Sequence, residues 1–282
     1  MRSNPIYRHT LRSAAWITVA ILIMIIVFVI AKSVPFFLSE GWFRILNDKG
    51  WFPGSGSFNM MPMLFASILI ALVTAAIAGP LGVLLAIFLN YYSPSSLARV
   101  FRAVIDLLAG LPSVVYGFWG LLVLVPLINS WIPPGASILA AVLVLCLMVL
   151  PLVVLLVDQA ISRLPSTWQQ AATALSIQRW SYIYKIVLPS LRPAIISGIL
   201  LQVGRALGET MAVLMVCGNI VQYPHNPFEP ARTLTANIAL EMGYASGSHA
   251  DALFVSAFIL LLATMVIIYM ASKQNASSYE LR

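Results

Sequence analysis

Charged residues are scarce in this chain of 282 residues. They make up 9% of the sequence and hydrophobic residues 61%, whereas a typical soluble domain carries about 25% charged residues. The two cysteines, Cys146 and Cys217, stand apart in separate apolar segments, which excludes a disulfide framework and a cysteine-rich zinc motif. No GxxxxGK[ST] phosphate-binding loop occurs, so the chain is predicted not to hydrolyse ATP by itself. The composition predicts a polytopic membrane protein.

Six apolar segments are long enough to cross a bilayer as helices, which takes about 20 residues each. They lie at Ala14–Ala31, Pro62–Asn90, Ala103–Ile128, Ile138–Val157, Pro193–Gly218 and Ala252–Ala271. The first has too long an apolar core for a signal peptide and is interpreted as an uncleaved signal anchor. The fold class is therefore an all-α membrane protein. Residues 1–60 hold the signal anchor and first outer loop, 61–271 the transmembrane core and 272–282 a cytoplasmic tail.

Lysine and arginine in the short flanks set the orientation, because cytoplasmic loops carry an excess of them. Eleven fall inside if the amino terminus is inside: Arg2, Arg8, Arg12, Arg99, Arg102, Arg163, Arg179, Lys185, Arg192, Lys273 and Arg282. Four fall outside: Lys32, Arg44, Lys49 and Arg232. Both termini are predicted to be cytoplasmic. The net charge of +7 is thereby attributed to these loops, and no nucleic-acid partner is expected.

The largest predicted cytoplasmic loop lies near residues 160–190 and reads SRLPSTWQQAATALSIQRWSYIYKIVLPSLRP. Ser166 and Gln169 behind Pro165 have the spacing of a capping box, which predicts a helix start. Leu188-Pro189 is predicted to end a second helix. Three alanines give the first helix a small face suited to close packing on another protein: Ala171, Ala172 and Ala174. The pattern alone fits an amphipathic hairpin on lipid headgroups equally well.

This loop resembles the "EAA" loop of binding-protein-dependent ABC importer permeases. The matching positions are Gln170, Ala171, Ala172, Ser176, Leu188 and Pro189. Gln170 stands where the family usually has Glu, and Ser176 where it usually has Gly. In that family the loop forms the coupling helix, which docks into a groove of the cytoplasmic ATPase. The resemblance implies the type I ABC importer permease fold.

Three longer stretches narrow the resemblance: GWFPGSGSFNMMPMLFASIL, GLPSVVYGFWGLLVLVPL and GRALGETMAVLMVCGN. They are similar to the C-type permease of the phosphate-specific Pst importer. The resemblance implies half of a path for inorganic phosphate in a prokaryotic inner membrane. It implies as partners a homologous A-type permease, two ATPase subunits that bind ATP and Mg, and an extracytoplasmic binding protein. No cofactor is expected in this chain, and sulfate, tungstate or phosphonate stay open as alternative substrates.

The segment VGRALGETMAV places two charges within a helix predicted over Pro193–Gly218, with Arg205 near the membrane midplane. Residues four apart share a helix face, so Arg205 and Glu209 are expected to meet. They form either a structural ion pair or part of the path, with Arg205 as oxyanion ligand and Glu209 as its electrostatic partner. Gly204 and Gly208 form a GxxxG pattern for close helix packing.

Two hydroxyl groups, those of Ser113 and Tyr116, are further candidates for the path, although Pro112 there fits a packed kink as well. Asp106 is expected to pair with Arg102, one turn earlier. The scattered histidines, His9, His225 and His249, suggest no metal site. A secondary transporter would show inverted repeats and broken helices at the midplane, and an intramembrane enzyme an HExxH, paired aspartates or a nucleophile with its base. None of these features is found.

Overall fold

The computed structural model describes residues 5–279, and the side chains of residues 10–273. The chain divides into two compact units, one of residues 1–61 and 238–259 and the other of residues 62–237 and 260–282. Four residues named in the sequence analysis lie outside the described side chains: Arg2, Arg8, His9 and Arg282. Helices α12 (Leu234–Glu241) and α13 (Ser248–Tyr279) each contribute residues to both units.

The first unit combines a long apolar helix with a small hairpin. Its elements are α1 (Pro5–Ser39), α2 (Phe43–Asn47), β1 (Trp51–Phe52), the 3-10 turn Pro53–Ser55 and β2 (Ser57–Phe58). Trp51 pairs with Phe58 across the antiparallel hairpin. The Trp51 indole donates a hydrogen bond of 2.8 Å to Glu241 at the end of α12, and His249 of α13 contacts the same carboxylate at 2.9 Å. These bonds fix the hairpin to the connection between α12 and α13.

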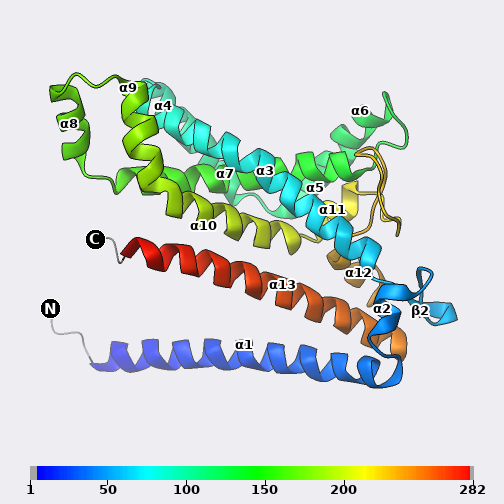
Figure 1. Cartoon of the computed structure of the whole chain (residues 1–282). Helices are drawn as coiled ribbons and strands as arrows, with labels where there is room; N and C mark the ends of the chain where they lie inside the picture. Colours follow the sequence, from blue (N-terminus) through cyan, green and yellow to red (C-terminus); the bar gives the residue numbers. More distant parts are fainter. Residues whose placement is uncertain (1–4, 280–282) are drawn as a thin grey trace. The chain divides into compact units, whose positions relative to one another are not determined.

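The second unit holds most of the helices (Figure 1). They are α3 (Met61–Tyr91), α4 (Ser95–Gly110), α5 (Ser113–Trp119), the π turn Gly120–Leu124, α6 (Val125–Asn129), α7 (Ile138–Ser162), α8 (Ser166–Ala174), α9 (Arg179–Tyr182), the π turn Ile183–Val187, α10 (Leu188–Leu207) and α11 (Met211–Val216).

Helix α7 is the centre of the second unit and packs against α4, α5, α10 and α11. It is apolar all round, as expected for a helix surrounded by others. Its amino-terminal N–H groups are satisfied by the loop that follows α11. Ile138 donates to the carbonyl of Glu229 at 3.0 Å and Leu139 to that of Pro227 at 2.8 Å. The Ser137 side chain caps the Ala140 N–H, so the loop and this cap together leave no free N–H group at the start of α7.

The predicted spans correspond to five long apolar helices and one bent pair. The prediction of one helix over Ala103–Ile128 was wrong, because α4 and α5 meet at 97°. Leu111 has φ −70° and ψ 137°, the extended conformation that a residue before proline prefers. Pro112 then follows as N-cap of α5. The chain therefore turns sharply at Leu111-Pro112.

Candidate translocation path and coupling loop

Arg205 and Glu209 lie on either side of a break between two helices. Helix α10 ends at Leu207 and α11 begins at Met211, so the single helix predicted over Pro193–Gly218 was wrong. Glycine costs about 1 kcal/mol in a helix relative to alanine, which favours an end at Gly208. The apolar span runs over Arg179–Leu207, so Arg205 lies near its end and not at its middle.

The Glu209 carboxylate has a local partner. It accepts a hydrogen bond of 3.2 Å from the N–H of Ala212 in the first turn of α11. The Glu209 carbonyl accepts a second bond, of 2.9 Å, from the Thr235 hydroxyl of α12. Within the described side chains no ion pair joins Glu209 to Arg205. The expected contact between the two charges is therefore not formed.

The Arg205 side chain is exposed on the surface of the single chain. It lies in the last turn of α10, where a cation interacts favourably with the negative end of the helix dipole. Its charge acts at a distance on Tyr116 of α5. These two predicted path residues therefore lie in the same unit, with no hydrogen bond between their side chains.

Tyr116 joins the two halves of the bent span. Its ring is 7% exposed, and its hydroxyl donates a hydrogen bond of 2.6 Å to the carbonyl of Leu108 in the last turn of α4. Ser113 is half-buried at the first position of α5. A cavity of about 270 Å³ lies at this bend and is lined mainly by apolar side chains: Leu108, Leu111, Val115, Tyr116, Trp119 and Leu147. The Tyr116 hydroxyl is therefore occupied in holding the bend.

Close helix packing occurs at glycines other than the predicted pair. A Cβ atom at Gly204 would meet Ile267 of α13 at an ordinary 3.5 Å, and one at Gly208 would meet only carbonyls of its own helix. In contrast, a Cβ atom at Gly117 would lie 2.7 Å from the Ala212 Cα, and one at Gly120 would lie 2.5 Å from Val144. The GxxG spacing within VYGFWG was the signal for this contact. It lets α5 approach α11 and α7.

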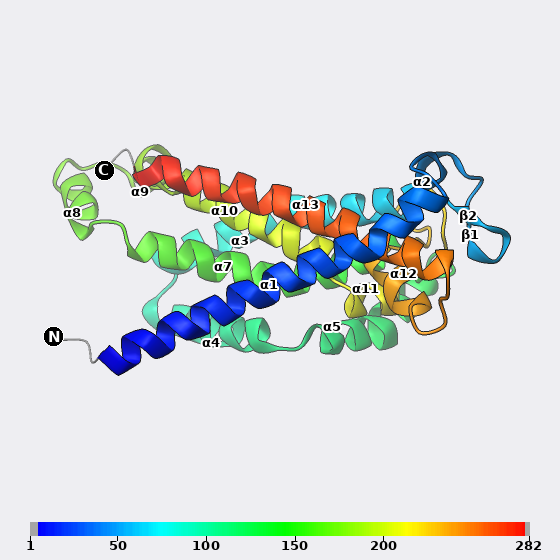
Figure 2. The ribbon, with the colours of Figure 1, turned by 90° about the horizontal axis from the view of Figure 1, so that it is seen from below.

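The coupling loop contains the exposed helix α8, which stands beyond the ends of α7 and α9 (Figures 1 and 2). The predicted capping box does not form, because Pro165 is the N-cap and no side chain caps the helix. Of the three alanines, Ala171 and Ala174 are exposed, and so is Gln170. Ala172 is 5% exposed. Ala172 is therefore buried and cannot contact another protein. The exposed residues left for the predicted docking surface are Gln170, Ala171 and Ala174.

Ser176 follows α8 with φ 52°, in the left-handed region. Glycine adopts this conformation without a steric penalty, whereas other residues pay about 1–2 kcal/mol. This geometry is the physical reason for glycine at the corresponding position of the EAA loop. The predicted turn is therefore present, and serine is less suited to its left-handed backbone than glycine would be.

Leu188-Pro189 does not end a helix, contrary to the prediction. The backbone passes from α9 through the π turn into α10, where Pro189 is the second residue. The N–H of Leu188 bonds to the carbonyl of Ile183, five residues earlier. Val125-Pro126 repeats the arrangement, with the Val125 N–H bonded to the carbonyl of Gly120. Widening the helix by one residue accommodates a proline that would otherwise break the bonding pattern.

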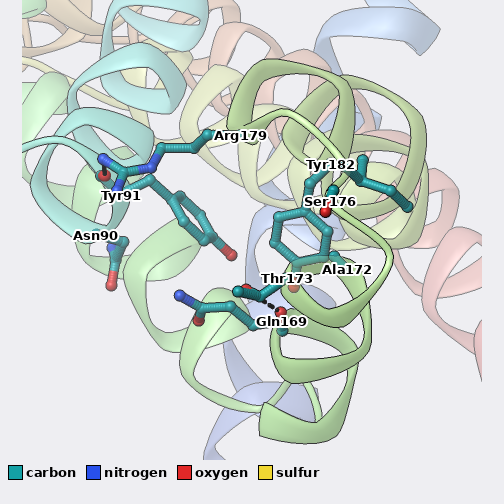
Figure 3. A pocket seen from close by; sticks show the side chains of 9 residues that line it. Asn90, Tyr91, Gln169, Ala172, Thr173, Ser176, Arg179 and Tyr182 are labelled. Carbon is teal, nitrogen blue, oxygen red and sulfur yellow. Dashed lines mark hydrogen bonds between the residues drawn. The ribbon is translucent and has the colours of Figure 1, made fainter.

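A polar cavity of about 510 Å³ lies beneath α8 (Figure 3). Its lining comes from the end of α3, from α8 and the turn that follows it, and from α9: Asn90, Tyr91, Gln169, Ala172, Thr173, Ser176, Ile177, Arg179 and Tyr182. Over the described residues, no group of three His, Cys, Asp or Glu side chains is placed to hold a metal ion.

Comparisons with known proteins place these features in a family. Residues 78–276 match the family described as "Binding-protein-dependent transport system inner membrane component". The chain is 34% identical to "Probable ABC transporter permease protein YqgH" of Bacillus subtilis, over 95% of this chain and 91% of that protein. It is 34% identical to the "Phosphate transport system permease protein PstC" of Xylella fastidiosa, over 85% and 78%.

Solved structures show the same fold. A bacterial ABC transporter that imports the polysaccharide alginate matches with TM-score 0.61 and 15% identity, over 98% of this chain and 99% of that one. The MetNI methionine ABC transporter matches with TM-score 0.59 and 17% identity, over 78% and 97%. With a family match over most of the core and an importer permease fold, the chain belongs to the binding-protein-dependent transport system inner membrane components and is a multi-span ABC importer permease.

Proposed function

We propose that this chain is the permease subunit of an ATP-driven importer of inorganic phosphate and forms half of its transmembrane path. The observation that carries the proposal is the 30–34% identity to PstC phosphate permeases over 85–95% of the chain. Sulfate, tungstate and phosphonate are the competing substrates, since a related permease plan serves other solutes as well.

Arg205 is the proposed oxyanion ligand of the path. Its guanidinium is exposed and forms no ion pair within the described side chains. A planar guanidinium binds phosphate oxygens through two parallel hydrogen bonds. Ser113 and Tyr116 border this region, with Tyr116 acting mainly through its bond to Leu108. An exposed guanidinium without an ion-pair partner among the described side chains, at a helix break, supports a polar path next to this surface.

Glu209 contributes a negative charge beside the path and, through Ala212, fixes the start of α11. The Glu209 carboxylate makes the electrostatic potential near Arg205 less positive, although the two side chains form no ion pair. Conduction requires binding that is weak enough for release, so a moderated cation suits transport better than an isolated one. Gly204 and Gly208 place no side chains on the surface of α10 around Arg205.

The proposed complex contains this chain, a homologous A-type permease, two ATPase subunits and an extracytoplasmic phosphate-binding protein. The exposed residues Gln170, Ala171 and Ala174 would dock on an ATPase, which would bind the ATP and Mg; this chain would need no cofactor. Both termini would be cytoplasmic. Within the second unit, α13 ends on the same side as α8 (Figures 1 and 2), which supports a cytoplasmic carboxyl terminus.

The test is uptake by the purified complex in liposomes. Radiolabelled phosphate should accumulate only with ATP and loaded binding protein, and excess sulfate, tungstate or phosphonate should not compete. Accumulation of one of these anions in place of phosphate would reassign the substrate. Uptake driven by an ion gradient without ATP would contradict the importer mechanism.

A further inference from the structure

The two ends of the coupling loop contact neighbouring residues at the carboxyl end of α3: Asn90 before the loop, and Tyr91 and Tyr92 after it. Before the loop, Asp158 of α7 accepts a hydrogen bond of 2.6 Å from the Asn90 side chain. After the loop, Arg179 donates a bond of 2.6 Å to the carbonyl of Tyr91. The Arg179 guanidinium also lies over the ring of Tyr92, 5.7 Å from its centre.

Arg102 of α4 completes the connection before the loop. Its Nη2 and Nε atoms lie 3.0 and 3.3 Å from the two oxygens of Asp158, and Nη2 also donates to Asn90 Oδ1 at 3.2 Å. The Asn90 amide donates a further bond, of 2.8 Å, to the carbonyl of Ala86. Every polar group of the Asn90 side chain is therefore engaged. Asn90, Arg102 and Asp158, here called the α3 junction, join the carboxyl end of α3, the middle of α4 and the carboxyl end of α7.

Helix α8 itself has little packing contact with the rest of the chain. Ala172 is its one buried residue, and the polar cavity of Figure 3 separates much of it from α3. A displacement of α8 by an ATPase therefore reaches the membrane helices mainly through the two ends of the loop. One end bonds to Asn90 and the other to the Tyr91 carbonyl, both in the last turn of α3.

We propose that the α3 junction is the point at which movement of the coupling loop is passed to the membrane-spanning helices. Asn90, Asp158 and Arg102 act as positioning residues for coupling, without contact to substrate or nucleotide. The inference rests on the proposed importer function. It assigns a role to Asp158 and Arg102 that the sequence did not suggest, since Arg102 was expected to pair with Asp106.

The test exchanges the amide and the carboxylate within the junction. Asn90→Asp places two carboxylates beside one guanidinium, and Asp158→Asn leaves none. The double variant Asn90→Asp/Asp158→Asn restores one carboxylate within reach of Arg102. Each single variant should lower the ratio of phosphate transported to ATP hydrolysed about tenfold, the factor expected for one lost charge-assisted hydrogen bond. The double variant should return to within about twofold of the parent, because coupled residues in one network compensate each other.

Two further measurements make the result decisive. Complex yield is measured for every variant, since loss of folding would lower yield, whereas loss of coupling would not. The control Arg163→Gln alters an exposed arginine of the same loop and should leave the transport ratio unchanged. A double variant no better than the poorer single variant, or single variants with the parental ratio, would overturn the proposal.

The second readout does not depend on phosphate. Binding protein carrying the ligand with which it was purified should stimulate ATP hydrolysis by the parent and by the double variant, but less by the single variants. If the parent hydrolyses ATP and moves no phosphate, the substrate assignment fails and this stimulation still tests the junction. Equal stimulation of all variants would contradict the inference.

Discussion

Arg205 and Glu209 are separated by the end of helix α10, and the Glu209 carboxylate bonds to the N–H of Ala212 instead of to the guanidinium. The two residues thus perform separate tasks. Arg205 presents a cation on the chain surface, and Glu209 fixes the start of the next helix. Variants of the two positions should therefore behave independently.

For this pair, Arg205→Gln should reduce phosphate uptake by roughly 100-fold or more with normal complex yield, because the donor fork is lost. Glu209→Gln should weaken the cap of α11, at a cost of about 0.5–1 kcal/mol in stability, and reduce uptake less. The double variant should show the sum of both effects. Recovery of uptake in the double variant would instead identify a structural ion pair.

At the coupling helix, Ala174→Trp should remove ATPase association while the chain still inserts into the membrane, because an exposed small residue becomes too large for a groove. Ala174→Ser is the matched control and should behave as the parent. Ala172→Trp should instead lower the yield of the folded chain, since that site is buried. Copurification with the ATPase and uptake are the measurements. Normal uptake by Ala174→Trp would show that α8 is not a docking element.

The turn after α8 offers a test of backbone strain. Ser176→Gly should raise the thermal stability of the complex slightly, because glycine accepts φ 52° without penalty. Ser176→Val should lower stability by more than about 1 kcal/mol, since a β-branched residue is disfavoured there. Thermal unfolding of the purified complex distinguishes the two. Equal stability of both variants would mean that the turn is not left-handed in solution.

At the bend between α4 and α5, Tyr116→Phe removes the 2.6 Å bond to the Leu108 carbonyl. We expect a loss of about 0.5–1.5 kcal/mol in stability, the net contribution of one hydrogen bond, because the Leu108 carbonyl keeps its bond of 3.2 Å from the Leu111 N–H. Because this bond holds the bend beside the proposed path, uptake should also fall. Tyr116→Leu, which removes the ring as well, should lose more stability. A Phe variant with parental stability and uptake would show that the hydroxyl does not hold the bend.

The orientation can be tested by cysteine labelling in cells. Leu175 is 73% exposed in the coupling loop, and a cysteine there should react only with a membrane-permeant reagent. A cysteine at the exposed His225 should react with an impermeant reagent from outside. The native cysteines, Cys146 and Cys217, are buried and give little background. Labelling of position 175 from outside would invert the predicted topology.

The sequence by itself determined the fold class, because apolar runs of about 20 residues leave few alternatives to membrane helices. It also located the exposed loop that carries α8, where Pro165, the alanines and Ser176 follow one another within a dozen residues. These features are local in the chain. Hydropathy and turn chemistry depend on neighbouring residues and can be predicted without knowledge of the tertiary contacts.

Only the tertiary structure decided which polar groups meet. Arg102 has Asp106 one turn away on its own helix, yet it binds Asp158 of α7, where the Asn90 amide can join the pair. Ala172 looks like its neighbours in sequence but faces inward, while Ala171 and Ala174 face outward. At the break after Leu207, the Glu209 carbonyl accepts a bond from Thr235, which lies 26 residues after Glu209 in the sequence. Helical periodicity gives the face of a residue, but the packing of distant helices decides what that face meets.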